Sequence, residues 1–294
     1  MNSSMHAFRG TGVALVTPFH ADGSLDLPSL ARLVDDVIAG GVNYLVALGT
    51  TAETPTLATG EKDAVLHTII EAAGGRVPIV CGAGGNNTAE IVHWLKESKH
   101  AGVDGILSVA PYYNKPGQEG IYRHFKAIAE GTELPIILYN VPGRTVTNIL
   151  PQTALRLAMD FGHIVAIKEA SGSLPQCMEL VAGAPEHFAV LSGDDNLVVP
   201  QMAIGMQGVI SVAANCFTAD FTGMVNAALS GDYETARKLQ YKLLPAIDLL
   251  FAEGNPTGVK AVLHAQGRMD NCLRLPLISA TDELKEKLGS ATAW

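Results

Sequence analysis

Disulfide patterns, metal-binding histidine patterns and long apolar runs are all missing from this sequence. Its four cysteines lie far apart with no CxxC pair, so we expect reduced, buried thiols rather than a disulfide scaffold or a zinc knuckle. None of the nine histidines belongs to an HxH or HExxH motif, which leaves a zinc-dependent hydrolase without ligands. No stretch approaches the roughly 18 apolar residues of a membrane span, and no basic segment precedes an apolar run near the N-terminus. These absences predict a soluble, cytoplasmic protein that holds no metal.

Positive charge and aromatic residues are also scarce. The 20 Lys and Arg are outnumbered by 29 Asp and Glu, and the formal net charge of −9 makes nucleic acids and anionic membrane surfaces poor partners. Aromatic residues make up 6% of the chain and charged residues 17%, whereas 48% is hydrophobic. This composition excludes a disordered chain and is typical of parallel strands buried beneath alanine-rich helices.

Eight short apolar runs alternate with helical segments along the chain. Each run contains β-branched residues, and most are bounded by Gly, Pro, Asp or Asn, as buried strands are. The runs span 12–18, 43–50, 77–83, 104–111, 134–140, 163–169, 188–194 and 207–213. Strict alternation requires parallel strands, so eight units predict an α/β fold, a (β/α)8 TIM barrel, over residues 1–229. Over residues 230–294 the pattern predicts helices and no further strand. We interpret this segment as a C-terminal helical extension.

Lys168 is the one lysine predicted at the end of a strand, and the carboxyl ends of the strands are where such barrels build their active sites. It follows the apolar run IVAI, where an ammonium group is costly unless it is paired. Because burial disfavours the charged form, a buried lysine supplies a free amine that attacks carbonyl carbons. The alternative is an ion pair with Glu169 or another carboxylate, and the residue pattern alone favours neither interpretation.

Further polar side chains are predicted at the same rim. Hydroxyl groups and one guanidinium follow three of the strands, at Thr50, Thr51, Tyr112, Tyr113, Tyr139 and Arg144. Hydroxyls in such positions pass protons, and an arginine grips a carboxylate through its planar fork. Each residue alone is equally well explained by packing or by an ordinary surface position. Their convergence on one rim is what indicates a site.

Two other motifs favour structural roles. The run GAGG at 82–85 resembles a dinucleotide-binding loop, but Asn87 stands at the third glycine position, which favours a tight turn. The pair Asp194-Asp195 is open to metal binding or to capping of a helix that begins near Asn196, and we favour capping.

Six motifs, in order along the chain, resemble those of the dihydrodipicolinate synthase family within the pyruvate-dependent class I aldolase superfamily. They are GTTAE at 49–53, PYYNKP at 111–116, YNVPGRT at 139–145, IKEASG at 167–172, SGDD at 192–195 and GVISVAAN at 208–215. The resemblance runs from about Gly12 to near the C-terminus. It implies a lyase that condenses pyruvate with L-aspartate 4-semialdehyde to give 4-hydroxy-tetrahydrodipicolinate, the first committed step of diaminopimelate and lysine biosynthesis.

The resemblance also implies catalytic roles. Lys168 matches the lysine that captures pyruvate as a Schiff base, and Tyr139 matches the tyrosine at the catalytic centre. Thr50 and Tyr113 match its partners in a proton relay, in which Tyr113 reaches in from a neighbouring subunit. The resemblance therefore implies a homotetramer built from two tight dimers. It implies no cofactor, because the lysine imine is itself the electron sink.

Substrate-binding positions follow from the same motifs. Thr51 matches the residue that holds the carboxylate of pyruvate, and Arg144 matches the arginine that binds the carboxylate of the incoming aldehyde. Gly193 and Ile210 match backbone positions that line the pocket.

The sequence departs from the family pattern within the GTTAE motif. Ala52 stands where the family has glycine, so a left-handed backbone at this position would cost about 1 kcal/mol. We expect a small adjustment of the loop.

A second departure lies at the family's allosteric lysine site. Asn86, Glu90 and Tyr112 match that site, but Thr59 and Lys62 stand where lysine-sensitive relatives carry histidines. The ammonium group of Lys62 disfavours a cationic effector, so we expect weak or absent inhibition by lysine.

Other pyruvate Schiff-base aldolases are the alternative, such as N-acetylneuraminate lyase or a keto-deoxy-sugar acid aldolase. These share the lysine and the tyrosine but commonly carry serine in the turn and no arginine after the YNxP motif. Thr50 and Arg144 together favour the condensation with aspartate semialdehyde.

Overall fold

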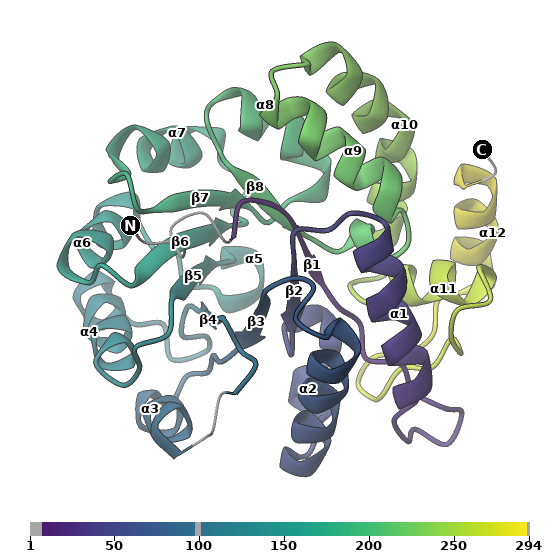
Figure 1. Cartoon of the computed structure of the whole chain (residues 1–294), viewed down its shortest axis with the longest axis horizontal. Helices are drawn as coiled ribbons and strands as arrows, with labels where there is room; N and C mark the ends of the chain where they lie inside the picture. Colours follow the sequence, from purple (N-terminus) through teal and green to yellow (C-terminus); the bar gives the residue numbers. More distant parts are fainter. Residues whose placement is uncertain (1–7, 98–100, 293–294) are drawn as a thin grey trace.

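Eight parallel strands close into a barrel in the order of the sequence. The computed structural model describes residues 8–97 and 101–292, and Figure 1 shows the strands at the centre with helices around them. The strands are β1 (Gly10–Ala14), β2 (Tyr44–Ala47), β3 (Ile79–Gly82), β4 (Gly105–Val109), β5 (Ile136–Asn140), β6 (Ile164–Glu169), β7 (Ala189–Ser192) and β8 (Gly208–Ser211). The predicted (β/α)8 barrel is confirmed.

The helices of the barrel follow the strands and pack around them. They are α1 (Leu27–Ala39), α2 (Thr59–Ala73), α3 (Thr88–Glu97), α4 (Gln118–Ala129), α5 (Pro142–Thr145), α6 (Pro151–Asp160), α7 (Leu174–Gly183), α8 (Val198–Ala203) and α9 (Thr218–Leu229). Short 3-10 turns, η2 (Thr50–Ala52), η3 (Thr54–Thr56), η4 (Asp195–Leu197) and η5 (Ala213–Asn215), follow strands β2, β7 and β8. No helix in the described ranges is long and apolar enough to cross a membrane.

The first strand lies earlier in the chain than predicted. The apolar run at 12–18 suggests a strand there, whereas β1 ends at Ala14. Leu15 and Val16 are buried in the layer between the barrel and its helices, and Pro18 lacks the N–H group that a ladder needs. An apolar run therefore marks burial correctly but extends beyond the residues that pair.

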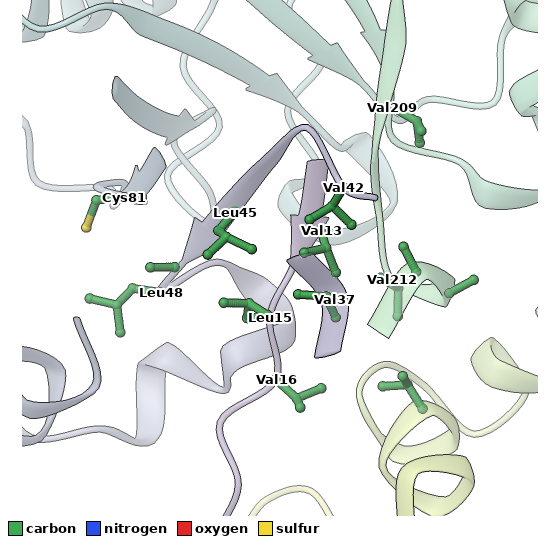
Figure 2. Close-up of a cluster of buried hydrophobic side chains, with 14 of the residues drawn as sticks. Val13, Leu15, Val16, Val37, Val42, Leu45, Leu48, Cys81, Val209 and Val212 are labelled. Carbon is green, nitrogen blue, oxygen red and sulfur yellow. The ribbon is translucent and has the colours of Figure 1, made fainter. Parts of the chain in front are cut away.

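Alternate strand residues divide the core into two layers. Tyr44 and Val46 of β2 point into the barrel, whereas Leu45 points outward. The outer layer is shown in Figure 2, where Leu45 lies with Val13 of β1 near Val37 of α1.

The large ring of Tyr44 decides what can stand beside it inside the barrel. A Cβ atom at Gly12 would lie 2.2 Å from the Tyr44 ring, so only glycine fits at that position. Because side chains fill the interior of such a barrel, its functional polar groups lie at the carboxyl ends of the strands.

Three further helices form the C-terminal extension, α10 (Tyr233–Phe251), α11 (Thr257–Ala265) and α12 (Asp282–Ala291). In Figure 1 they lie on one side of the barrel, beside α1 and α9. A cavity of about 590 Å³ opens between the start of α9, α11 and α12. None of the residues that line this cavity is a predicted site residue.

Candidate active site

Lys168 and Tyr139 lie side by side at the carboxyl ends of two neighbouring strands. They are direct partners in the β5–β6 register, and both side chains are buried. The Lys168 Nζ atom lies 4.4 Å from the centre of the Tyr139 ring. The structure thus brings together an amine and a phenol at the predicted rim.

Glu169 does not neutralise Lys168, because successive strand residues point to opposite faces. Its carboxylate is completely buried and accepts hydrogen bonds from Asn140 Nδ2 at 2.9 Å, Gln176 Nε2 at 3.0 Å and the Ser171 amide at 2.8 Å. Among the described residues, Lys168 has no carboxylate within 4.0 Å. The ion-pair interpretation of Lys168 is therefore wrong, and its amine is available for chemistry.

The two aspartates after β7 join neighbouring strand ends instead of capping a helix. Asp195 Oδ2 accepts from the amides of Val212 at 3.0 Å and Ala213 at 2.7 Å, beyond the end of β8. Asp194 accepts from the amide of Gly172, and neither carboxylate caps the turn that begins at Asp195. The predicted capping role is wrong, because these acceptors face amides from other loops.

No cluster of three or more His, Cys, Asp or Glu side chains suited to a metal occurs within the described ranges.

Burial dominates the electrostatics of Asp195. Desolvation raises the pKa of its carboxyl to about 6, although the two amides and the charge of Lys168 oppose this shift. Burial likewise raises the pKa of Asp194. Acidic groups thus lie around Lys168 without pairing with it directly.

Gly193 makes room for the Lys168 side chain. A Cβ atom at position 193 would lie 3.0 Å from Lys168 Cε and 2.5 Å from Ala170 Cβ. Ile210 of the adjacent strand β8 is buried inside the barrel. Gly193 thus directly follows β7, and Ile210 lies in β8.

We expect Gly193→Ala to displace Lys168 and to lower kcat by up to about 100-fold, since a misplacement near 1 Å has effects of that size. Steady-state kinetics would measure the loss, with circular dichroism to establish that the fold is retained. Gly162→Ala is the matched control, because nothing lies within 4 Å of a Cβ there. An unchanged kcat in Gly193→Ala would contradict the role of this glycine.

The turn that carries the two threonines follows β2 and is held by hydrogen bonds. We call residues 49–56 the threonine turn. Thr51 is buried, and its Oγ1 accepts from Asn255 Nδ2 at 2.9 Å, whereas Thr50 is partly exposed. Thr17 Oγ1 donates to the Ala52 carbonyl at 2.8 Å. Both predicted threonines are thus placed beyond the end of β2, at the same rim as Lys168.

Ala52 is compatible with this turn because it is not the left-handed residue. Ala52 lies in the 3-10 turn η2, and the positive φ of 54° falls on Glu53 instead. The strain considered for alanine at position 52 does not arise.

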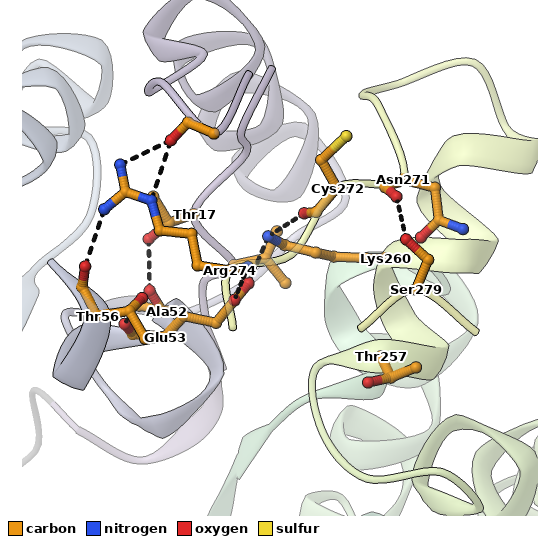
Figure 3. Close-up of polar contacts among 12 residues, drawn as sticks. Thr17, Ala52, Glu53, Thr56, Thr257, Lys260, Asn271, Cys272, Arg274 and Ser279 are labelled. Carbon is orange, nitrogen blue, oxygen red and sulfur yellow. Dashed lines mark hydrogen bonds and ion pairs between the residues drawn. The ribbon is translucent and has the colours of Figure 1, made fainter. Parts of the chain in front are cut away.

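Sequence reasoning missed an ion pair that holds the threonine turn. Lys260 of α11 donates to Glu53 Oε1 and to the Cys272 carbonyl at 2.8 Å, and both charged side chains are completely buried (Figure 3). The Arg274 amide donates to Glu53 Oε2 at 3.0 Å. Burial lowers the pKa of Lys260, while the charge of Glu53 opposes this. A lysine between apolar residues of the segment VKAV was the one signal of this pair in the sequence.

Tyr113 and Arg144 lie outside the buried group. Tyr113 is 87% exposed and has a left-handed backbone with φ of 73°, which is rare for an aromatic residue. Arg144 lies exposed on the short helix α5. Within one chain, neither residue joins Lys168 and Tyr139.

The predicted effector residues lie on α3, on the loop before it, and on the loop between β4 and α4. The Asn114 side chain donates to the Asn86 carbonyl at 3.1 Å, which joins the loop before α3 to the loop that carries Tyr112. Tyr112 is 41% exposed, and Glu90 is exposed on α3.

The class of lysine-dependent, class I aldolases is defined by a closed (β/α)8 barrel with a buried lysine at a strand end beside a tyrosine, and no described carboxylate pairs with Lys168 here. Comparison with known proteins identifies the family within that class. The model of the Dihydrodipicolinate synthetase family matches residues 7–293. The chain belongs to this family.

Individual relatives agree with this membership over nearly the full length. The chain is 50% identical to the 4-hydroxy-tetrahydrodipicolinate synthase of Flavobacterium psychrophilum over 284 residues, 97% of each protein. It is 51% identical to that of Koribacter versatilis, covering 97% of this chain and 95% of the relative. A solved dihydrodipicolinate synthase from Thermotoga maritima superposes with a TM-score of 0.94 at 42% identity, over 97% of this chain and 98% of that one.

Proposed function

We propose that this protein condenses pyruvate with L-aspartate 4-semialdehyde to give 4-hydroxy-tetrahydrodipicolinate. The observation that carries the proposal is Lys168, buried without an ion pair beside Tyr139 at the end of β6. Two relatives that are 50% and 51% identical over nearly the full length bear the name of the enzyme that makes this product. The reaction is the first committed step of diaminopimelate and lysine biosynthesis.

The chemistry begins with the side-chain amine of Lys168. The Nζ atom adds to the ketone carbon of pyruvate, and loss of water from the carbinolamine leaves an imine. The imine withdraws electrons from the methyl group, so loss of a methyl proton gives an enamine. The enamine carbon then forms a bond to the aldehyde carbon of aspartate semialdehyde. The amine of the product attacks the imine carbon, which closes the ring and releases Lys168.

Each step moves a proton, and the hydroxyl groups at the rim supply the path. Tyr139 lies against Lys168 and exchanges protons with the carbinolamine, and Thr50 relays them. Tyr113 completes the relay from a neighbouring subunit, which its exposure of 87% in the single chain supports. No cofactor is needed, because the imine stabilises the carbanion.

Substrate carboxylates are bound at two places. The hydroxyl of Thr51 binds the carboxylate of pyruvate, with Gly193 and Ile210 beside the reacting carbon. Arg144 binds the carboxylate of the aldehyde, since its exposed guanidinium lies just beyond the end of β5.

In our proposal Tyr113 requires a partner subunit in a tight dimer, and two such dimers form a homotetramer. The protein acts in the cytoplasm. One structural relative, 41% identical with a TM-score of 0.94, is a monomeric dihydrodipicolinate synthase variant.

The test is a coupled assay with pyruvate and aspartate semialdehyde, in which dihydrodipicolinate reductase consumes the product and nicotinamide absorbance is followed. We expect turnover with this aldehyde and none with N-acetylmannosamine or with sugar-derived aldehydes. Turnover with one of the sugars alone would contradict the proposal and favour another pyruvate aldolase.

A further inference from the structure

Asn255 joins the C-terminal extension to the threonine turn across 204 residues of sequence. It lies between α10 and α11 and is 7% exposed. Its Nδ2 atom donates to Thr51 Oγ1 at 2.9 Å. No motif in the sequence points to this contact, and the proposed reaction assigns Asn255 no role.

The direction of this hydrogen bond decides where the Thr51 proton points. A threonine hydroxyl has one proton to donate and lone pairs that accept. The Asn255 amide donates to a lone pair of the Thr51 hydroxyl oxygen. No group among the described residues accepts the Thr51 hydroxyl proton. The proton is therefore left to an acceptor outside the chain, such as a carboxylate oxygen.

The extension is also anchored firmly enough to hold Asn255 in place. Lys260, in the helix that follows Asn255, pairs with Glu53, two residues after Thr51 in the threonine turn. Arg274 donates through its amide to Glu53 and through its guanidinium to the Thr56 carbonyl at 2.9 Å (Figure 3). The extension therefore contacts the threonine turn at Thr51 and again at Glu53 and Thr56, which follow Thr51 in the chain.

We propose that Asn255 is a positioning residue for pyruvate, acting through Thr51: its amide fixes the Thr51 hydroxyl so that the proton is directed to the carboxylate of the substrate. This inference rests on the proposed function, in which Thr51 binds that carboxylate. The C-terminal extension then takes part in substrate binding rather than only covering the barrel.

The experiment measures pyruvate capture directly. Borohydride reduces the pyruvate imine to a stable adduct, and mass spectrometry gives the pyruvate concentration for half-maximal labelling. We expect Asn255→Ala to raise this concentration about 10-fold, the size of effect expected when one buried hydrogen-bond partner is lost. Asn255→Asp should raise it further, because a carboxylate accepts the Thr51 proton and repels the pyruvate anion. The KM for the aldehyde should stay unchanged.

Two comparisons separate positioning from general damage. Asn271→Ala is the matched control, an asparagine of the same extension with no hydrogen bond to the threonine turn in the described structure, and it should label like the parent. In a Thr51→Val background the hydroxyl is gone, so Asn255→Ala should have no further effect. Equal effects of Asn255→Ala with and without the Thr51 hydroxyl would overturn the inference, as would unchanged labelling of the single variant. A parent protein that forms no pyruvate adduct would overturn the proposed function as well.

Discussion

Lys168→Ala is expected to reduce turnover by at least roughly 10³-fold and to abolish the pyruvate adduct, because removing a covalent nucleophile removes the whole imine route. The variant should fold normally. The Lys168 side chain has no ion pair to lose in the described structure, and an alanine side chain in its place removes a charge that is costly to bury.

Two companion variants make this result specific. Lys168→Arg keeps the positive charge but provides no amine for imine formation, so it should be as inactive as Lys168→Ala. Lys238→Ala removes an exposed lysine of α10, whose surface ion pair with Glu234 is worth little, and it should retain full activity. A borohydride-trapped adduct on any lysine other than Lys168 would show that the nucleophile has been misassigned.

Lys260→Met is expected to lower the free energy of unfolding by about 3–5 kcal/mol, the usual effect of removing one partner from a buried ion pair. Glu53 would keep its charge in a site closed to water, and the Cys272 carbonyl would lose its donor. Because Glu53 belongs to the threonine turn, binding of pyruvate should weaken together with stability.

Urea unfolding, followed by circular dichroism, would measure this change. The double variant Lys260→Met with Glu53→Gln should recover part of the loss, since no uncompensated charge then remains buried. Lys238→Met is the exposed control and should change stability by no more than about 0.5 kcal/mol. If Lys260→Met unfolds at the same urea concentration as the parent, the buried pair does not stabilise the turn.

Local patterns predicted the architecture well. Each of the eight apolar runs contains or overlaps a strand, and the (β/α)8 barrel follows from their number and their alternation with helices. The position of Lys168 after IVAI predicted a strand-end amine, which the structure places beside Tyr139. These features were predictable because strand period, turn residues and apolar runs depend on neighbours in sequence.

The partners of buried polar groups were not predictable in this way. Glu169 accepts a hydrogen bond from the Asn140 side-chain amide on the outer face of the barrel. Asp195 accepts from a backbone amide beyond β8 and does not cap the helical turn in which it lies. Tyr113 is 87% exposed in the single chain, and its place in a relay completed by a neighbouring subunit stays a prediction.

The sequence by itself thus determined the barrel and the strand-end lysine with Tyr139 on the neighbouring strand. Only the tertiary structure decided which groups pair with which: Lys260 with Glu53, 207 residues apart, and Asn255 with Thr51, 204 residues apart. The physical reason is that burying a polar or charged group is costly without a partner, and the partner is whichever complementary group packing brings within hydrogen-bond distance. That choice is made between segments far apart in the chain, where no local pattern records it.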